Sequence, residues 1–432
     1  MAWDFRTDPD FQQQLDWMDG FVRAEIEPID VLWGHRAYHP PDPTLRRIVD
    51  PLKAEVRRRG LWACHLGPDL GGQGYGQLKL ALMNEILGRS NWAPIVFGCQ
   101  APDTGNAEII AHYGTPEQKA RYLAPLLAGE IFSCYSMTEP QGGSDPKLFR
   151  TCAVRHGDDW VITGEKFFSS NLETAAFVIV MAVTDPDAPP YQRMSMFLVP
   201  RETPGLRVVR LLGTAGEPLG HGMHAYVRYE DVRVPAANLL GGEGQGFAIA
   251  QTRLGGGRIH HAMRTVVQCR RAFDMMCERA LSRETQGSML AEKQSVQNYI
   301  ADSYAQIEQF RLFVLYTAWL IDQKTTAGVR KEIAACKVLA ATVLHDVVQR
   351  AIQVHGALGV SNELPLVGLW HVAAMMGIMD GPTEVHRVTV ARQVLKGRRP
   401  APDGWPSEHV PRKVASARAK FAALLEHEVG NL

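Results

Sequence analysis

Hydrophobic residues recur at helical spacing through about the first 130 residues of the chain. The pattern predicts a first helix that Pro28 ends or kinks, and a second helix that Gly60 stops. Pro51 marks either the true start of that second helix or a kink within it. Further helices are expected over Leu78–Arg89 and Thr104–Tyr113, with a new helix start at Thr115, Pro116 and Gln118. Residues 1–130 are therefore expected to form an N-terminal helical domain.

From about residue 131 the hydrophobic period changes to two, and β-branched and aromatic residues become frequent. Strands are expected over residues 160–163, 166–169, 177–183, 194–199 and 225–229. The backbone from Tyr135 to Thr138 is expected to run as an edge strand. Residues 131–240 would then form a middle β domain of ordinary size.

Helical spacing returns after the glycine-rich loop that ends at Gly246. Four long helical patterns follow, and the breaks between them fall near Gln286-Gly287, 325–328 and 356–366. Four long helices joined by short breaks predict a four-helix bundle over residues 241–400. The tail, 401–432, begins with proline and glycine and is expected to hold one last helix, Val414–His427. The predicted class is thus α+β, with several domains.

The overall composition excludes some functional classes. The 46 basic residues balance the 46 acidic ones, which argues against a nucleic-acid or membrane-surface role driven by bulk charge. Seven scattered cysteines without a C-x-x-C pair favour a reducing compartment, with no disulfide framework and no metal site. The start lacks a signal-peptide pattern, and the longest apolar run, Leu312–Ile321, is too short to span a bilayer. We expect a soluble, cytoplasmic protein without a membrane segment.

The stretch from Met379 to Arg387 is the strongest candidate for chemistry. Asp380 stands directly before Gly381 and Pro382, two residues that together end a helix and force a turn. A carboxylate at such a break can point away from the helix, and helical spacing resumes at Thr383. The alternative interpretation is a turn aspartate that caps the next helix.

Two segments near the start of the β region suit a ligand. Gly142 and Gly143 let the chain pass close to a bound molecule, and the neighbouring Ser144 can hydrogen-bond to it. In the second segment, Phe168 offers a flat face, and Ser170 offers a donor on the same side of the strand. This pair fits a flat aromatic cofactor. The alternatives are a turn of small residues and an ordinary amphipathic strand.

Polar residues in the helical region extend this set. Arg283 suits a phosphate, although it equally suits the C-terminus of a helix. The stretch Gln353–Gly359 is a helix end with glycines that can approach a pyrophosphate, or else a simple C-cap. His260 and His261 are adjacent and point about 100° apart on a helix, which makes a poor metal pair.

Taken in order, these segments resemble the acyl-CoA dehydrogenase family. The matching motifs are Thr138–Asp145, Gly164–Asn171, Glu230–Pro235, Gly244–Gly246, Arg283–Gly287, Gln353–Gly359 and Asp380-Gly381. The resemblance covers nearly the whole chain. It implies a helical domain, a β domain and a four-helix bundle, with FAD bound between the last two.

The resemblance also implies roles for individual residues. Those implied to contact FAD are Tyr135, Met137, Thr138, Phe168, Ser170, Arg283, Gln294, Gln353, Gly356 and Glu384. Among them, Ser170 would bond flavin N5, and Arg283 and Gln294 would reach the pyrophosphate. Gln353 and Gly356 would contact the FAD of a neighbouring subunit, which implies a homodimer or homotetramer. Ser144, Arg258 and Gly381 would lie on the acyl-CoA side.

The implied reaction is α,β-dehydrogenation of an acyl-CoA thioester. Asp380 would take the α-proton, flavin N5 would take the β-hydride, and an electron-transfer flavoprotein would receive the electrons. Most members have glutamate where this chain has Asp380, and some carry it instead just before the arginine that matches Arg258, where this chain has Gly257. The ending D-G-P-x-E-V-H resembles a subgroup that uses aspartate as the base.

Two other functions remain open at this stage. The first is a flavin oxidase of the same fold, either an acyl-CoA oxidase or an enzyme similar to nitroalkane oxidase, whose acceptor would be dioxygen. The second is a scaffold that binds acyl-CoA or a partner without turnover. Asp380 and the flavin motifs together favour an enzyme.

Overall fold

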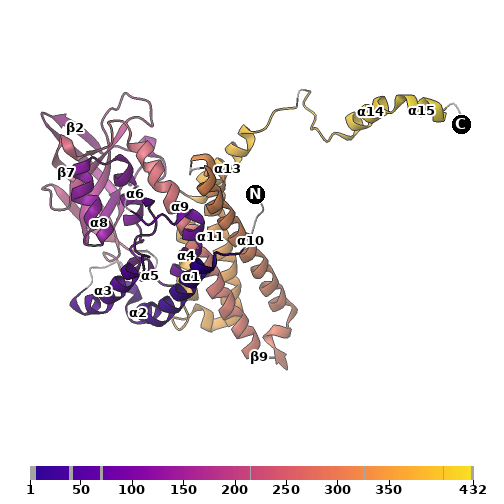
Figure 1. Ribbon diagram of the computed structural model, residues 1–432, viewed down its shortest axis with the longest axis horizontal. Coiled ribbons are helices and arrows are strands. Elements are labelled where there is room, and N and C mark those ends of the chain that lie inside the picture. The colour runs from indigo at the N-terminus through magenta and orange to yellow at the C-terminus, as the bar shows by residue number, and fades with distance from the viewer. Residues whose placement is uncertain are drawn as a thin grey trace. The chain divides into compact units, whose positions relative to one another are not determined.

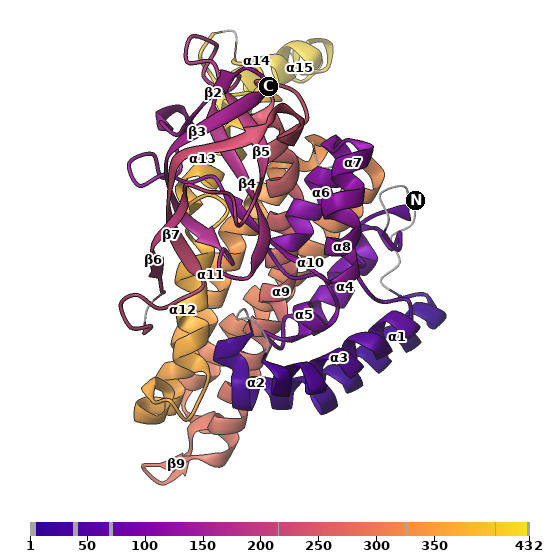
Figure 2. The ribbon, with the colours of Figure 1, turned by 90° about the vertical axis from the view of Figure 1, so that its left-hand side faces the viewer.

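The computed structural model describes residues 6–37, 42–68, 72–214, 216–324, 327–401 and 403–429. The chain forms two compact units, Met1–Arg387 and Val388–Leu432. The first unit has helices at its beginning, a sheet in the middle and long helices after it, as Figures 1 and 2 show. The expected α+β architecture, with a central sheet between two helical regions, is therefore confirmed.

The N-terminal region is built from helices, as predicted. Its α-helices are α1 (Pro9–Phe21), α2 (Glu27–Trp33), α3 (Pro43–Arg58), α4 (Gly76–Leu87), α5 (Ala93–Val96), α6 (Asp103–Tyr113), α7 (Pro116–Gln118) and α8 (Ala124–Ala128). The chain stays helical up to Pro28 through a π-helical turn, Val22–Ile26, because the missing proline N–H widens the ladder. Helix α3 begins at Pro43, so Pro51 lies inside it.

The predicted helix start at Thr115 is confirmed. The Thr115 hydroxyl accepts from the Gln118 backbone N–H, and the Gln118 side chain accepts from the Thr115 N–H. These reciprocal bonds form a capping box that satisfies two otherwise unpaired donors. The helical chain then runs through a π-helical turn, Lys119–Leu123, into α8.

The middle of the chain forms one sheet of eight strands. Its strands are β1 (Phe132–Ser136), β2 (Cys152–His156), β3 (Asp159–Ser170), β4 (Ala175–Val183), β5 (Met194–Pro200), β6 (Leu206–Leu212), β7 (His224–Pro235) and β8 (Leu239–Leu240). Their order is β6-β7-β3-β1-β4-β5-β8, with β2 beside β3 and β4. The predicted strand segments all fall within these bounds, and the first two are parts of the single strand β3.

One prediction about the sheet is wrong. Strand β1 is interior, because it pairs in parallel with β4 and meets β3 at Tyr135, which lies opposite Ser170. The expected edge strand therefore does not exist, and Met137 and Thr138 follow the end of β1. Strand order depends on which segments meet in space, and the local pattern of one segment does not record it.

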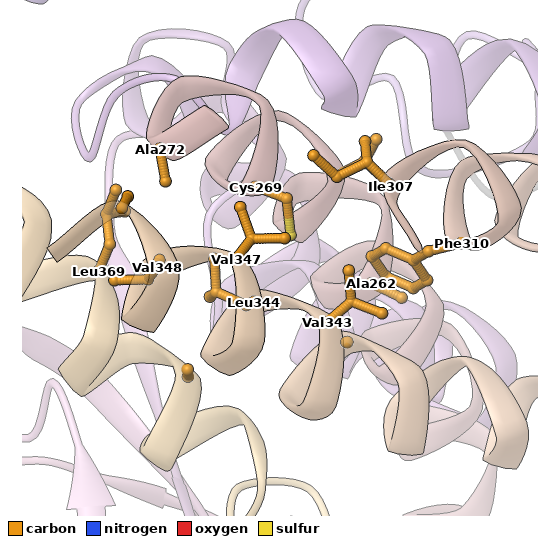
Figure 3. Packing of buried hydrophobic residues seen from close by; sticks show 14 of the residues in the cluster. Ala262, Cys269, Ala272, Ile307, Phe310, Val343, Leu344, Val347, Val348 and Leu369 are labelled. Carbon is orange, nitrogen blue, oxygen red and sulfur yellow. The ribbon is translucent and has the colours of Figure 1, made fainter. Parts of the chain in front are cut away.

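The C-terminal helices pack around one apolar core. The long helices are α9 (Gly246–Ser282), α10 (Gln294–Lys324) and α11 (Arg330–His355), and the shorter α12 (Leu366–Met376) follows them. The three breaks lie where they were predicted, but the fourth expected long helix is interrupted after Met376. The short strands β9 (Glu284–Thr285) and β10 (Ser288–Met289) form the first break, and Thr325 of the second lies outside the described residues. Figure 3 shows Cys269 of α9, Phe310 of α10 and Val347 of α11 converging in this core.

The N-terminal helix α4 packs against α9 and α10, and α6 packs against both β1 and α9. This places the end of β1 beside the first half of α9. Helix α13 (Thr383–Lys396) spans the boundary between the two units, and the second unit also holds α14 (Val410–Lys420) and α15 (Ala422–Val429). The single tail helix expected over Val414–His427 is therefore two helices. No helix among the described residues is long and apolar enough to cross a membrane.

Candidate active site

Asp380 lies in a turn that is held at both ends. Helix α12 stops at Met376, whose carbonyl accepts a 2.7 Å hydrogen bond from the buried Lys337 ammonium of α11. At the other end, the Thr383 backbone N–H and hydroxyl both donate to the Gly377 carbonyl, at 2.9 and 3.2 Å. Asp380 has a φ of +54°, a left-handed conformation that is uncommon for a residue other than glycine. The backbone of this turn is therefore fixed by contacts from two other elements.

The carbonyl of Asp380 is engaged, whereas its N–H is not. The Arg258 Nε of α9 donates to this carbonyl at 3.0 Å, and His386 Nε2 approaches it at 3.2 Å. Arg258, expected on the acyl-CoA side, thus also positions the backbone of Asp380. Gly381 follows with a φ of +103°, and a Cβ atom there would lie 3.0 Å from the His386 ring. Among the described residues, no acceptor faces the Asp380 N–H.

The Asp380 carboxylate faces an imidazole. His261 Nε2 lies 3.4 Å from Asp380 Oδ2, and the Asp380 side chain keeps 19% of its surface exposed. Burial raises the pKa of Asp380, but the positive charges of His261, when it is protonated, and of Arg253, Lys337 and Arg258 outweigh burial and lower the pKa overall. Burial also lowers the pKa of His261 to about 4. Near neutral pH the carboxylate is ionised and the imidazole is neutral.

Helix α9 carries glycines against this carboxylate and against α6. A Cβ atom on Gly257 would lie 3.5 Å from Asp380 Oδ2, and one on Gly256 would lie 2.8 Å from Glu108 Oε2. Each glycine in a helix interior costs about 1 kcal/mol relative to alanine. The run Gly255–Gly257 was a visible sequence signal for a crowded helix face, and the sequence reasoning did not use it.

Arg253 joins this face to the end of β1. Its guanidinium carbon lies 3.9 Å from the ring centroid of Tyr135, and its Nε donates to Asn106 Oδ1 at 2.9 Å. Asn106 in turn donates to the Ser133 hydroxyl. The sequence reasoning selected Tyr135 but missed Arg253, because an arginine inside an amphipathic helix has no distinguishing local pattern.

A second cluster lies where the chain leaves β1. The Lys166 ammonium of β3 is fully buried and donates to the Met137 carbonyl at 2.8 Å and to Glu139 Oε1 at 2.9 Å. Glu139 also accepts from the backbone N–H groups of Arg150 and Thr151. A buried ion pair with this many hydrogen bonds determines the path of the chain through Met137 and Thr138.

Phe168 and Ser170 meet at His224 of β7. The Phe168 ring centroid lies 5.4 Å from that of His224, and the Ser170 hydroxyl lies 2.8 Å from His224 Nδ1. Phe168 has a φ of +56° within a register shift between β3 and β7, so the regular strand assumed from the sequence is interrupted there. The two side chains nevertheless meet on one side of the sheet.

The groups near Phe168 fit a flat, polar-edged ring system such as flavin. The Phe168 side chain is 47% exposed, an apolar face that a planar ring would cover. The neighbouring Asn171 is buried, and its Oδ1 has no hydrogen-bond partner among the described residues. The residues present therefore suit the cofactor that the motifs imply.

The remaining predicted cofactor residues are not brought to this cluster within one chain. Arg283 follows α9 and lies about 37 Å further along its axis than Arg258, at 1.5 Å per residue. Gln353 lies about 24 Å further along α11 than Lys337 by the same rise. Gln294 begins α10 beyond the β9–β10 hairpin, and Gly356 caps α11 with a φ of +65°. Ser144 and Glu384 are exposed.

Comparisons with known proteins agree with this arrangement. Three acyl-CoA dehydrogenase family models match the chain, the N-terminal domain at residues 8–130, the middle domain at 134–232 and the C-terminal domain at 244–395. The chain belongs to the acyl-CoA dehydrogenase family. It is therefore an oxidoreductase that acts on acyl-CoA, and membership supports FAD as its cofactor.

Several relatives of this acyl-CoA dehydrogenase family member are close in sequence or structure. The chain is 45% identical over 366 residues to a probable acyl-CoA dehydrogenase, FadE2, of Mycobacterium tuberculosis, covering 83% of this chain and 88% of the relative. A putative acyl-CoA dehydrogenase from Mycobacterium abscessus has a TM-score of 0.85 and 38% identity, covering 91% and 99% of the two chains. A chain from the structure named "Electron transferring flavoprotein of Acidaminococcus fermentans" has a TM-score of 0.75 and 27% identity, covering 91% and 100%.

Other curated relatives are much longer than this chain. The chain spans between 36% and 49% of the length of seven of them, which are named acyl-CoA dehydrogenase family members 10 and 11 and the plant protein IBR3. The similarity to them therefore concerns one part of each of these proteins.

Proposed function

We propose that this chain catalyses α,β-dehydrogenation of an acyl-CoA thioester, with Asp380 as the general base and FAD as cofactor. The observation that carries the proposal is an ionised carboxylate on a turn that Lys337, Arg258 and His386 hold in place. A general base must be unprotonated at the working pH and held within reach of the proton it removes. Asp380 meets the first condition because nearby cations lower its pKa.

The backbone of the same residue supplies a second group. The Asp380 N–H donates to no acceptor in the described part of the chain, so it is available to the thioester carbonyl. A hydrogen bond to that oxygen would stabilise the negative charge that develops when the α-proton leaves. Arg258 supports this role because its bond to the Asp380 carbonyl fixes the orientation of the turn.

The cofactor would lie along the cluster of Met137, Thr138, Phe168 and Ser170. When bound, FAD supplies the acceptor for the hydride that leaves the β-carbon. Phe168 would cover one side of the ring system, and Ser170 would hydrogen-bond its edge. The buried pair of Lys166 and Glu139 would keep the Met137–Thr138 backbone in position.

The position of Arg283 supports an assembly of at least two copies. Because Arg283 lies far along α9 from Arg258, it would serve the pyrophosphate of a cofactor held mainly by a neighbouring copy. Gln353 and Gly356 would contribute in the same way. An electron-transfer flavoprotein is the proposed electron acceptor, and the 27% identical chain from a structure of that name supports it.

Anaerobic stopped-flow bleaching of the purified flavoprotein by acyl-CoA thioesters tests this function. We expect rapid bleaching by at least one thioester and slow reoxidation by air. The Asp380→Asn variant keeps the shape of the side chain, should still bind FAD and thioester, and should bleach about a thousandfold more slowly. The exposed Asp302→Asn is the matched control and should behave as wild type. Bleaching of Asp380→Asn at the wild-type rate would refute the base assignment, and rapid turnover with dioxygen would favour an oxidase.

A further inference from the structure

Glu108 and Arg253 lie on two helices near Asp380, and Arg253 helps to lower the pKa of this base through its charge. Glu108 lies on α6, and its Oε2 faces Gly256 of α9. Among the described residues, neither a hydrogen bond nor an ion pair holds its carboxyl group, and Arg253 is the group whose charge acts on it. The Glu108 side chain is half-buried, so a carboxyl group without a protein partner there is available to a polar ligand group.

The Arg253 guanidinium also has polar groups without a protein partner. Its Nε donates to Asn106 and its guanidinium stacks on Tyr135, which leaves the terminal amino groups without a protein acceptor in the described chain. Arg258 and Lys337, the other cations near Asp380, each donate to a backbone carbonyl. Arg253 and Arg258 both keep terminal amino groups that can bind a ligand anion, and Arg253 is the one whose charge acts on Glu108.

Both side chains lie between α6 and α9. A Cβ atom on Gly105 of α6 would lie 2.8 Å from Arg253 Cγ, and one on Gly256 of α9 would lie 2.8 Å from Glu108 Oε2. Gly105 precedes Glu108 by three positions, and Arg253 precedes Gly256 by three, so the helices meet in register through one turn of each. Arg253 and Glu108 thus lie on facing helices and are offset by one helical turn. Gly256, which Glu108 contacts, is next to Gly257, which faces Asp380.

The charges around this space are unbalanced. Arg253, Arg258 and Lys337 are cations, whereas Asp380 is the ionised carboxylate that offsets them. Burial raises the pKa of Glu108 to about 7, and the charge of Arg253 opposes this rise, so near neutral pH Glu108 carries a proton for much of the time. An unsubstituted alkyl chain would leave Arg253 desolvated without a counter-charge, which is costly.

We propose that Arg253 and Glu108 form a subsite that binds an oxyanion on the acyl group of the substrate, such as the terminal carboxylate of an ω-carboxyacyl thioester. Arg253 donates charge-assisted hydrogen bonds to the oxyanion, and protonated Glu108 donates one more. The subsite rests on the proposed function, because it assumes that the acyl group lies beside Asp380. It determines which acyl-CoA the enzyme prefers and leaves the reaction unchanged.

Proton linkage follows from this geometry. Charged and titratable groups on the elements that pack against α6 include Arg253 and Arg258 of α9, Tyr135 of β1, and Arg121 and Tyr122 of the π-helical turn before α8, and α6 itself carries Asp103 and His112. Of these, Arg253 shifts the pKa of Glu108. A bound oxyanion beside Glu108 favours its protonated form, so binding takes up a proton when the pH is near or above the pKa of free Glu108. Affinity for the oxyanion is therefore highest below about pH 7 and falls above it.

The test compares thioesters of linear dicarboxylic acids with unsubstituted thioesters of the same chain length, over a series of lengths. In the holoenzyme we expect the ratio of their kcat/KM values to exceed about ten at the best length. Arg253→Met should lower that ratio by roughly ten- to a hundredfold, the scale of a lost charge-assisted contact. Arg121 also lies over a tyrosine ring, that of Tyr122. Arg121→Met is therefore the matched control and should leave the ratio unchanged.

Calorimetry in the Asp380→Asn background measures binding without turnover. The apparent enthalpy for the ω-carboxyacyl thioester should depend on the ionisation enthalpy of the buffer, which reports proton uptake, and Glu108→Gln should remove that dependence. An unchanged ratio in Arg253→Met, or a preference for unsubstituted or hydroxylated thioesters in the wild type, would overturn the subsite. A protein whose flavin no thioester bleaches would instead overturn the proposed function.

Discussion

His261 Nε2 faces Asp380 Oδ2 at 3.4 Å, across the gap between α9 and the turn that follows α12. The imidazole is neutral near neutral pH because burial lowers its pKa to about 4. The carboxylate is ionised because the charges of Arg253, Lys337 and Arg258, and of His261 once acid protonates it, outweigh the effect of burial on the Asp380 pKa. A base that is both ionised and partly shielded is ready to take a proton from carbon without first losing one to solvent.

The pH dependence of flavin reduction tests this pair. Because the pKa of Asp380 is lowered, protonation should inactivate the base only well below neutral pH, and the rate should be constant from about pH 6 upward. His261→Phe removes the neighbour that lowers this pKa most and should move the acid limb upward by about one pH unit. Stopped-flow measurement of the flavin-reduction rate across pH gives the acid limb of the wild type and of the His261→Phe variant. An acid limb at the same pH in both proteins would contradict the pairing.

Gly257 offers a test of where the base can stand. A Cβ atom there would lie 3.5 Å from Asp380 Oδ2, so a side chain at 257 and one at 380 converge on the same space. Asp380→Gly should lower the flavin-reduction rate about a thousandfold. Adding Gly257→Glu should raise that lowered rate by about tenfold or more. Gly257→Gln in the same background is the matched control. Equal rates for the glutamate and glutamine variants would show that the position cannot supply a base.

The buried pair of Lys166 and Glu139 should be important for stability. Lys166→Met leaves Glu139 with its backbone donors but without its counter-charge, at a cost of about 3–5 kcal/mol. The pH dependence of this stabilisation follows from Glu139. Lys166 and hydrogen bonds lower the folded-state pKa of Glu139 in spite of burial. Its contribution is therefore present above its unfolded pKa and is lost as pH falls through the folded value.

Thermal and urea unfolding of the Lys166 variants measure this contribution. Lys147→Met removes a lysine that pairs with Asp145 at the surface and should change the unfolding midpoint little, since exposed pairs contribute at most about 1 kcal/mol. If the two lysine variants unfolded at the same midpoint, the buried pair would have no special role in the Met137–Thr138 segment.

Arg283 should matter for cofactor retention and for the assembly. Arg283→Ala should weaken FAD binding by about 2 kcal/mol, roughly thirtyfold, and leave the fold intact. Because the arginine would serve a cofactor held by a neighbouring copy, wild-type FAD retention should also fall on dilution below the assembly constant. Fluorescence titration with FAD and gel filtration measure the two effects. Arg279→Ala, one turn earlier on α9, is the control, and equal FAD affinity in both variants would exclude the pyrophosphate role.

Periodicity and turn residues were sufficient for much of the fold. The change from helical to alternating spacing near residue 131 located the sheet, because a half-buried strand and an amphipathic helix repeat differently along the chain. The capping box at Thr115 was predictable because it involves residues only three positions apart. Asp380 could be selected because Gly381 and Pro382 make a local break, and the order of the motifs indicated the family.

Only the tertiary structure showed what surrounds that carboxylate. Strand β1 is interior because β3 and β4 pair with its two sides. Both strands come later in the chain, so the local pattern of β1 does not reveal them. Glu108, Arg253, His261 and Lys337 come from three different helices, and each has an unremarkable local pattern. The effect of Arg253, His261 and Lys337 on Asp380 depends on short distances and on shared burial, because charge interactions are strong only where water is excluded. Separation along the chain carries no such information, so the ionisation of the base and the unpartnered charges beside it emerged from the fold alone.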